Sequence, residues 1–204
     1  RELFSEAQLL LPNSLYLRQL LLEADAPPKK VVLHRLGIKL EEFPFVDRTG
    51  RTGPLKIVAV GRFVEKKGFR YLLQALAAVE SGISLECEII GDGPLMPELK
   101  ALATQLGLGD TVRFMGWRNT DEVAGAMVEA DLFMAPSVTA EDGDMEGMPL
   151  VITEAMGTGL PVIGTRHSGI PEAIQDGENG IIVEEKDVEG LRNAIEYFSK
   201  PTNS

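Results

Sequence analysis

From Leu55 onward, short apolar runs rich in β-branched residues alternate strictly with stretches of helical periodicity. Runs that are apolar throughout are typical of strands covered by helices on both faces. Strict alternation predicts an α/β, Rossmann-like, doubly wound parallel sheet, whose ligands bind outside the carboxyl ends of the strands. The expected strands are Leu55–Val60, Leu85–Ile90, Val112–Met115, Leu132–Ala135, Pro161–Gly164 and Gly180–Val183, and the expected helices are Phe69–Val79, Leu95–Leu106, Asp121–Glu129, Leu150–Met156 and Val188–Phe198.

Composition is that of a globular protein with one domain and a small appendage. The 204 residues are 44% hydrophobic and 25% charged, which is enough for a sizeable core. The net charge of -11 argues against a nucleic-acid partner. The single cysteine, Cys87, lies in an apolar run and cannot form an internal disulfide, which favours a cytoplasmic location. No apolar run is long enough to span a bilayer.

The first 45 residues follow a different pattern. Leu9–Leu11 and Val31–Leu33 are short strand candidates, and Ser14–Ala24 between them is a helix candidate. The segment from Phe45 to Pro54 is rich in glycine and ends on a proline, which is typical of a linker. We therefore expect residues 1–45 to be the tail of a preceding domain with its linker, and residues 46–204 to form the ligand-binding domain.

The loop Gly61–Gly68 follows the first expected strand of the sheet and carries two cations suited to phosphate. Arg62 can donate paired hydrogen bonds to phosphate oxygens, and Lys67 can add a point charge. Gly61 lets the backbone approach a ligand closely. On this segment alone, however, a solvated basic loop is the favoured interpretation.

The second loop, Gly91-Asp92-Gly93-Pro94, follows the next expected strand. Gly91 and Gly93 permit close approach of a ligand, and Pro94 suits the start of a helix. A plain strand-to-helix turn explains the same residues equally well. The third glycine of the dinucleotide fingerprint is absent, which disfavours a dehydrogenase.

The third loop leads into the helix expected from Leu150 and has the features of an anion site. Pro149 suits the first position of a helix. The backbone N–H groups of Leu150 and Val151, with those of Gly147 and Met148, are then free to bind an anion, and the helix dipole adds to the attraction. The sequence therefore predicts that a pyrophosphate could bind there.

Two glutamates flank this helix start, Glu146 in the loop and Glu154 about one turn into the helix. Glu154 could accept hydrogen bonds from vicinal ribose hydroxyls, and Glu146 could do the same for a sugar. A single glutamate there would be interpreted as a surface charge, but two glutamates around the helix start favour a ligand-binding role. The nearby segment Asp142–Asp144 suggests a hard cation, yet its spacing is not that of an EF-hand, so we favour a solvated loop.

The fourth loop, Thr165–Glu172, follows the fifth expected strand and places His167 and Ser168 near the ligand edge. His167 could act as a base. Because the sequence shows no partner for it, a hydrogen-bonding loop residue is the favoured interpretation.

In their order along the chain, these motifs resemble the glycosyl transferases group 1 family, also called glycosyltransferase family four. Its members are retaining enzymes with the GT-B fold, in which two Rossmann-like domains face each other across a cleft. The resemblance extends from about Val31 to Phe198. The matching segments are Gly37-Ile38, Gly61–Gly68, Ile90–Pro94, Val112–Gly116, Ala130-Asp131, Pro136-Ser137, Glu146 with Glu154, Gly159–Val162 and Asp176–Gly180.

The resemblance implies that the donor is a nucleotide sugar, with a UDP- or GDP-sugar expected and neither cofactor nor metal. Arg62 and Lys67 would hold the diphosphate, Glu146 the transferred sugar and Glu154 the ribose, while Arg113–Trp117 would border the base. The implied catalytic residues are Arg62, Lys67 and Glu146, and the implied donor contacts are Gly61, Gly91, Gly93, Arg113, Met115, Gly147, Met148, Pro149, Leu150, Val151 and Glu154.

Two departures point to a branch of the family. The family usually has Glu-Gly-Phe-Gly where this chain has Glu146–Pro149, and the acidic segment before it is longer than usual. With residues 34–38 and 167–172, these features resemble enzymes that build exopolysaccharides of the colanic acid and amylovoran kind.

In the family, the acceptor site comes largely from the N-terminal domain, of which residues 1–33 look like the last unit. The resemblance therefore implies a chain that binds a donor and lacks most of the acceptor site. The acceptor would be a carbohydrate or a lipid-linked molecule, and the whole enzyme could associate peripherally with the inner face of the cell membrane.

Three functions remain open from the sequence. The first is glycosyl transfer with retention, in which the donor phosphate helps to deprotonate the acceptor, since no carboxylate is an obvious nucleophile. The second is a nucleotide-sugar epimerase or a phosphorylase, which shares the two-domain architecture. The third is a module that binds a nucleotide sugar and is inactive in isolation.

Overall fold

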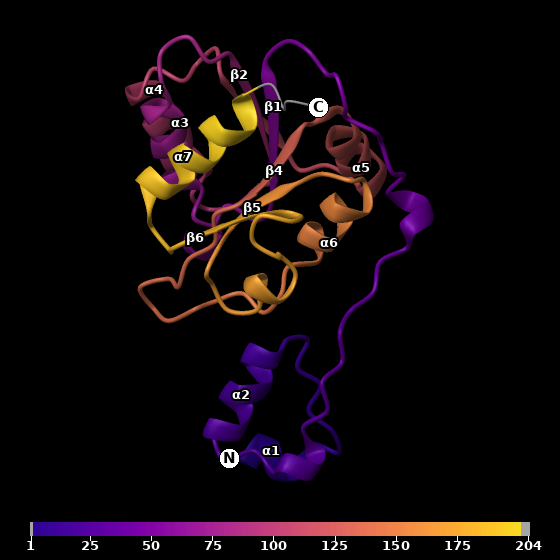
Figure 1. Ribbon diagram of the computed structural model, residues 1–204. Coiled ribbons are helices and arrows are strands. Elements are labelled where there is room, and N and C mark those ends of the chain that lie inside the picture. Colours follow the sequence, from indigo (N-terminus) through magenta and orange to yellow (C-terminus); the bar gives the residue numbers. More distant parts are fainter. Residues whose placement is uncertain (1, 201–204) are drawn as a thin grey trace.

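The computed structural model describes residues 2–200 and contains a six-stranded parallel sheet in the order β3-β2-β1-β4-β5-β6 (Figure 1). The expected α/β doubly wound fold is confirmed, and each strand lies within one residue of its predicted range. Arg1 and residues 201–204, which the predicted domain ranges include, lie outside the described part. The strands are β1 Leu55–Val60, β2 Leu85–Ile90, β3 Val112–Gly116, β4 Leu132–Ala135, β5 Val162–Thr165 and β6 Gly180–Val183.

The helices of the main domain also follow the prediction, with small shifts at their ends. The side chain of Asn119 accepts a hydrogen bond from the backbone N–H of Glu122, and the backbone N–H of Asn119 donates one to the carboxylate of Glu122. This capping box fixes the start of α5. The expectation that Pro94 starts α4 is wrong, because the helix begins at Met96 and holds Pro97 in its first turn. The helices are α3 Phe69–Ala78, α4 Met96–Gln105, α5 Thr120–Glu129, α6 Leu150–Gly157 and α7 Val188–Ser199.

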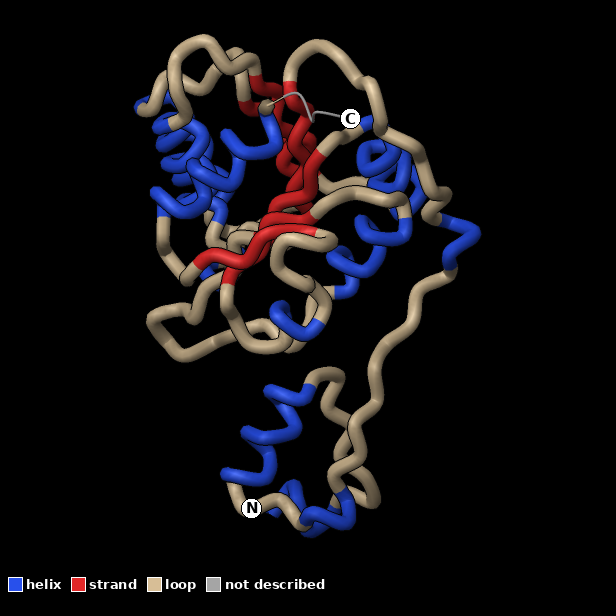
Figure 2. The backbone as a smooth tube through the Cα atoms, in the orientation of Figure 1, coloured by secondary structure: helices blue, strands red, loops and turns tan. Residues whose placement is uncertain are grey.

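Helices cover both faces of the sheet, as the apolar strands require (Figure 2). On one face, α3, α4 and α7 pack against the sheet through a buried cluster that includes Leu72 and Ile195. On the other face, α5 and α6 pack through a second cluster that includes Phe133 and Ile152. All six strands are parallel, so their carboxyl ends, and the loops that follow them, lie along one edge of the sheet.

The segment at the expected linker packs against the α5–α6 face of the sheet. Phe43, which follows the short 3-10 helix η2 (Leu40–Glu42), is 3% exposed and belongs to the cluster on that face. The guanidinium of Arg48 donates hydrogen bonds to the carbonyl oxygens of Met127, Ala130 and Thr158, at the ends of α5 and α6. These carbonyls end their helices without helical partners, so Arg48 satisfies them.

Residues before the linker form a small unit below the main domain in Figure 1, and it contacts the loop after β5, because the backbone N–H groups of Leu15 and Tyr16 donate to the carboxylate of Glu172. It contains α1 (Glu2–Glu6), α2 (Leu15–Glu23) and the 3-10 helix η1 (Pro28–Lys30). The two strands predicted there are reduced to a single parallel bridge between Leu10 and Val31. The backbone N–H of His34 also donates to the carbonyl oxygen of Pro12, but Pro12 has no N–H to complete a second bridge.

Candidate functional site

The strand order reverses between β1 and β4, and the loops that follow these two strands meet at this point. The β1 loop contains the 3-10 helix η3 (Glu65–Lys67), and the β4 loop carries Glu146. Nζ of Lys67 lies 3.3 Å from Oε1 of Glu146, and the two side chains are only 15% and 12% exposed. The structure therefore joins two predicted site residues from distant parts of the sequence, at the position where doubly wound sheets bind ligands.

Lys66 is a second cation at this point, which sequence reasoning missed. Its Nζ lies 3.0 Å from the carboxylate of Asp144 and 3.8 Å from that of Glu146, and it donates a hydrogen bond to the carbonyl of Met145. Two adjacent lysines were visible in the sequence, but only the turn of η3 shows that both face the β4 loop. Arg62, in contrast, is exposed and forms no direct ion pair with a described residue, although its charge adds to the hydrogen bond from Lys66 in lowering the pKa of Asp144.

The start of α6 presents unpaired backbone donors. Pro149 precedes the helix as its N-cap, one position earlier than predicted. Among residues 2–200, no acceptor receives a hydrogen bond from the backbone N–H of Gly147, Met148, Leu150 or Val151. These donors and the positive end of the helix dipole lie where the sequence predicts an anion site, which stays a prediction. A small pocket there is lined by Val60, Lys67, Phe69, Phe133, Met134, Ala135, Pro136, Ser137, Pro149 and Val151.

The two glutamates that flank this helix start have different surroundings. Burial, and then the charge of Glu42 in η2, raise the pKa of Glu154 above its usual 4.5. Oε1 of Glu146 is buried and accepts no hydrogen bond from a described residue, although the Lys67 ammonium pairs with it by charge. Both carboxylates therefore retain capacity to accept hydrogen bonds from a ligand.

The glycines after β1 and β2 serve backbone packing. A Cβ at Gly91 would overlap the carbonyl oxygen of Gly61, and one at Gly93 would lie 2.6 Å from the carbonyl oxygen of Phe63. Gly61 itself lies under the Lys67 side chain. The structure therefore explains Gly91 and Gly93 by close contact between two loops, a reason that neither ligand approach nor a plain strand-to-helix turn had included.

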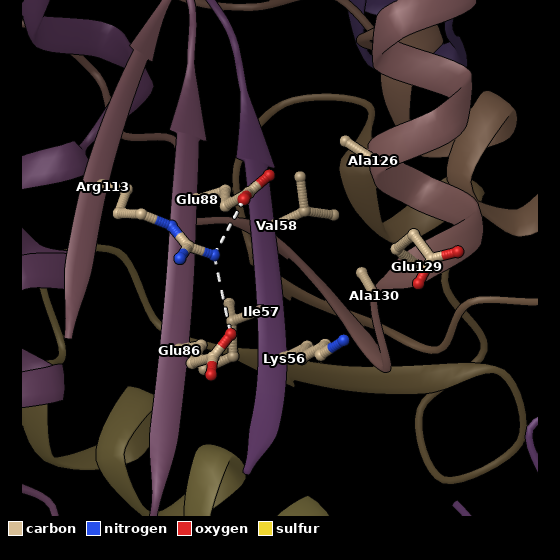
Figure 3. Close-up of a pocket in the computed structure, with 9 residues that line it drawn as sticks. All are labelled: Lys56, Ile57, Val58, Glu86, Glu88, Arg113, Ala126, Glu129 and Ala130. Atoms are coloured by element: carbon tan, nitrogen blue, oxygen red, sulfur yellow. Dashed lines mark hydrogen bonds and ion pairs between the residues drawn. The ribbon is translucent and has the colours of Figure 1, made fainter.

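Arg113 does not join the other predicted residues. It is the second residue of β3, and its guanidinium lies 3.0 Å from the carboxylate of Glu88 and 3.5 Å from that of Glu86 (Figure 3). We therefore withdraw Arg113 from the candidate site, because two carboxylates already hold it away from the carboxyl end of the strand. Met115 lies nearer that end, half-buried against the α5–α6 core. The groove around Arg113 is lined by Lys56, Ile57, Val58, Glu86, Glu88, Ala126, Glu129 and Ala130.

His167 has the hydrogen-bonding role that the sequence favoured. It is 1% exposed, and its two ring nitrogens contact the backbone of Glu146 and the carboxylate of Glu185. The acidic segment between Asp142 and Asp144 is a turn closed by a hydrogen bond from the Asp144 backbone to the Asp142 carboxylate. Among the described residues, no three or more potential metal ligands gather into one group.

The fold is a doubly wound domain with a candidate anion site at its switch point. The sequence model of the Glycosyl transferases group 1 family matches residues 54–200, and this chain belongs to that family. The chain is 34% identical over 201 residues to a Salmonella typhimurium protein named for colanic acid biosynthesis, the glycosyltransferase WcaL, and covers 50% of it. It is 38% identical over 190 residues to the amylovoran biosynthesis glycosyltransferase AmsK of Erwinia amylovora and covers 47% of it. These alignments include 98% and 93% of this chain, which thus spans about half the length of the two relatives.

Solved structures share the fold. The structure of Anabaena HepE in complex with UDP superposes with a TM-score of 0.80 at 24% identity, over 94% of this chain and 54% of that protein. Sucrose-phosphate synthase from Thermosynechococcus elongatus gives a TM-score of 0.82 at 24% identity, over 96% of this chain and 50% of that protein. In the part of the chain that is described, none of the helices has the length and apolar character needed to cross a membrane.

Proposed function

We propose that this chain is the donor-binding half of a retaining glycosyltransferase of exopolysaccharide biosynthesis, with a UDP- or GDP-sugar as donor. The observation that carries the proposal is the meeting of Lys67, Glu146 and the free N–H groups of α6 at the switch point. The relatives WcaL and AmsK are named for colanic acid and amylovoran biosynthesis, and HepE has been solved with UDP and with UDP-glucose. These names support an exopolysaccharide role and a nucleotide-sugar donor.

In this proposal the diphosphate of the donor binds at the start of α6, where four backbone N–H groups are unpaired. Lys67, Lys66 and the exposed Arg62 supply positive charge around it. A diphosphate that draws Lys67 away from Glu146 would leave Oε1 of Glu146 open to a sugar hydroxyl. Glu154, one turn into the helix, would accept the ribose hydroxyls.

The same groups would assist cleavage of the donor. The bond between the anomeric carbon and the diphosphate breaks, and negative charge develops on the leaving phosphate. Donors already aimed at that charge stabilise the transition state without having to reorganise. Glu146 is paired with Lys67, which favours a role in sugar binding over one as a nucleophile. We therefore propose same-face transfer, in which the donor phosphate accepts the proton of the acceptor hydroxyl.

The acceptor would be bound largely by a part of the protein beyond this chain. We propose that residues 1–45 are the tail of the acceptor domain with its linker, and that residues 46–204 form the donor domain. The anchoring of Phe43 and Arg48 on the α5–α6 face supports a junction in this region. The acceptor would be a carbohydrate or a lipid-linked molecule, handled in the cytoplasm at the inner face of the cell membrane.

We expect the affinity for a nucleotide sugar to rise with pH as Glu154 ionises. An ionised carboxylate accepts hydrogen bonds from ribose more strongly than the acid does, and the raised pKa of Glu154 moves this rise above 4.5. The folded chain therefore binds this proton more tightly than the unfolded chain, so Glu154 also makes the free energy of unfolding fall as pH rises through the same window. Calorimetric titration with a nucleotide sugar from pH 4.5 upward measures the profile.

Glu42→Gln is the informative variant for this profile, because Glu42 is the second cause of the shift. Its midpoint should lie at lower pH than that of the unsubstituted chain. Glu41→Gln, which removes an adjacent exposed carboxylate, is the matched control and should leave the midpoint unchanged. An affinity that does not vary with pH would contradict the role of Glu154 in ribose binding.

The proposed function is tested by thermal unfolding with a panel of UDP-, GDP- and ADP-sugars. A donor present at about 100 times its Kd stabilises the folded chain by about 2.7 kcal/mol, which corresponds to roughly 5–10 °C in Tm for a chain of this size. We expect one nucleotide class to give such a shift. No shift with any nucleotide sugar would refute the proposal. Product analysis of the longer enzyme then separates transfer from epimerisation or release of a sugar phosphate.

A further inference from the structure

His167 connects three loops at the carboxyl edge of the sheet. It lies just after β5 and is 1% exposed. Its Nε2 lies 3.0 Å from the backbone nitrogen of Glu146 in the β4 loop, and its Nδ1 lies 2.6 Å from Oε1 of Glu185 just after β6. One buried imidazole thus bridges the loop that carries the candidate sugar-binding carboxylate and a second carboxylate behind it.

The hydrogen bonds determine the state of this ring. A backbone N–H can only donate, so Nε2 must accept from Glu146 and carries no proton. The remaining ring proton is therefore on Nδ1 and is donated to Glu185. His167 is a neutral imidazole in a single tautomer. A proton added at Nε2 would break the bond to the Glu146 backbone.

Glu185 is itself held in place as an acceptor. The backbone N–H of Thr139 donates to its Oε2 at 2.8 Å, and the Thr139 hydroxyl donates to Oε1 at 3.3 Å. Burial alone would raise the pKa of Glu185, but the hydrogen bonds from Thr139 and His167 outweigh it and hold the pKa below its usual range. A carboxylate at Glu185 that accepts these bonds favours the tautomer of His167 that donates from Nδ1.

The residues after His167 hold the same stretch of the β4 loop from the other side. The hydroxyl of Ser168 donates to the carbonyl oxygens of Glu146, at 2.6 Å, and Gly147, at 3.1 Å. The backbone N–H of Gly169 donates to the Gly147 carbonyl at 2.9 Å. Ser168 has a φ of +47°, an unfavourable conformation for a residue with a side chain, which these bonds help to maintain. The backbone of Glu146 is therefore fixed at both its N–H and its carbonyl.

We propose that His167, oriented by Glu185, is a positioning residue that fixes the Glu146 loop so that the free carboxylate oxygen meets the sugar of the donor. This inference rests on the proposed function and assigns a further pair of residues to the same site. Most of the proposed nucleotide contacts, which are the N–H groups of Leu150 and Val151 and the ammonium of Lys67, lie beyond the stretch that His167 holds, although Gly147 directly follows it. Loss of His167 should therefore weaken recognition of the sugar much more than recognition of the nucleotide.

The experiment compares two ligands in each variant, the nucleoside diphosphate and the corresponding nucleotide sugar, by calorimetry on the full chain. In His167→Phe, which leaves the Glu146 N–H without its acceptor, affinity for the nucleotide sugar should fall about tenfold while affinity for the nucleoside diphosphate changes less than about twofold. His167→Gln offers an oxygen near the position of Nε2 and should recover most of the loss. Glu185→Gln should cause a smaller loss of the same kind, and the adjacent, exposed Glu184→Gln should cause none.

A spectroscopic measurement tests the network even if His167→Phe does not fold. The ¹⁵N chemical shifts of the His167 ring in the unsubstituted chain should show a protonated Nδ1 and an unprotonated Nε2. An imidazolium, or a ring protonated only on Nε2, would overturn the inference. The inference would also be overturned if His167→Phe and Glu185→Gln lost equal affinity for both ligands, or lost affinity for neither. If the unsubstituted chain binds no nucleotide sugar, the proposed function and this inference are both refuted. If it binds and the substitutions of His167 leave the affinity unchanged, only this inference is refuted.

Discussion

Lys67→Ala is expected to lower the affinity for the nucleotide-sugar donor by roughly 10- to 100-fold, which is about 1.5–3 kcal/mol for a hydrogen bond to a charged group. The ammonium lies beside the free N–H groups of α6, where the diphosphate is proposed to bind. Its removal also leaves the Glu146 carboxylate with only Lys66, at 3.8 Å, as a compensating charge. The uncompensated carboxylate would then repel the phosphate in addition to the lost attraction.

The matched control is Lys56→Ala, which removes the same charge from the groove at the opposite end of β1 and should leave the affinity unchanged. The double variant Lys67→Ala with Glu146→Gln separates the two contributions, because it removes the repulsion along with the attraction. We expect it to bind the nucleoside diphosphate more tightly than Lys67→Ala alone. Calorimetry at two salt concentrations measures both effects, and equal affinities in Lys67→Ala and the unsubstituted chain would refute the phosphate site.

The sheet could be predicted from the sequence because β4 and β5 are buried at every position and the other strands are largely apolar. Runs such as Leu132–Ala135, which are buried at every position, have no alternating pattern and are bounded by helix signals such as the Asn119 capping box. The local sequence pattern was enough to predict those strands. It was not enough for Leu9–Leu11 and Val31–Leu33, because a segment becomes a strand only if a partner extends the ladder of hydrogen bonds.

The site could be predicted where the signal was carried by backbone geometry. A proline before an apolar run marks a helix start, and free N–H groups follow from any helix start, so the helix start that carries the candidate anion site could be predicted. The direction in which side chains point could not be predicted in the same way. Arg113 and Lys66 are both cations near strand ends, but strand alternation turns Arg113 onto Glu88, whereas the η3 turn aims Lys66 at the β4 loop. The contact between His167 and Glu185 depends on β5 and β6 being neighbours, which alternation alone does not show.

Gly91→Ala is expected to destabilise the fold by about 3–5 kcal/mol, in the range of substitutions that force backbone strain or steric overlap. Gly91 has a φ of +140°, and an added Cβ would overlap the carbonyl oxygen of Gly61, which is backbone and cannot rotate away. Relief would require separating the β1 and β2 loops, and the hydrogen bond from the Gly91 N–H to the Gly116 carbonyl ties the β2 loop to β3 as well. Urea unfolding measures the loss.

Gly125→Ala is the matched control, since Gly125 is exposed in α5 and an added Cβ there meets nothing within 4 Å. That substitution should stabilise the chain by about 0.5–1 kcal/mol through the better helix propensity of alanine. The comparison also separates the two roles proposed for Gly91. If it serves loop packing, Gly91→Ala loses stability while the fraction that stays folded binds the nucleotide sugar normally. A variant of unchanged stability that fails to bind the donor would instead mean that Gly91 makes room for the ligand, and the packing explanation would be wrong.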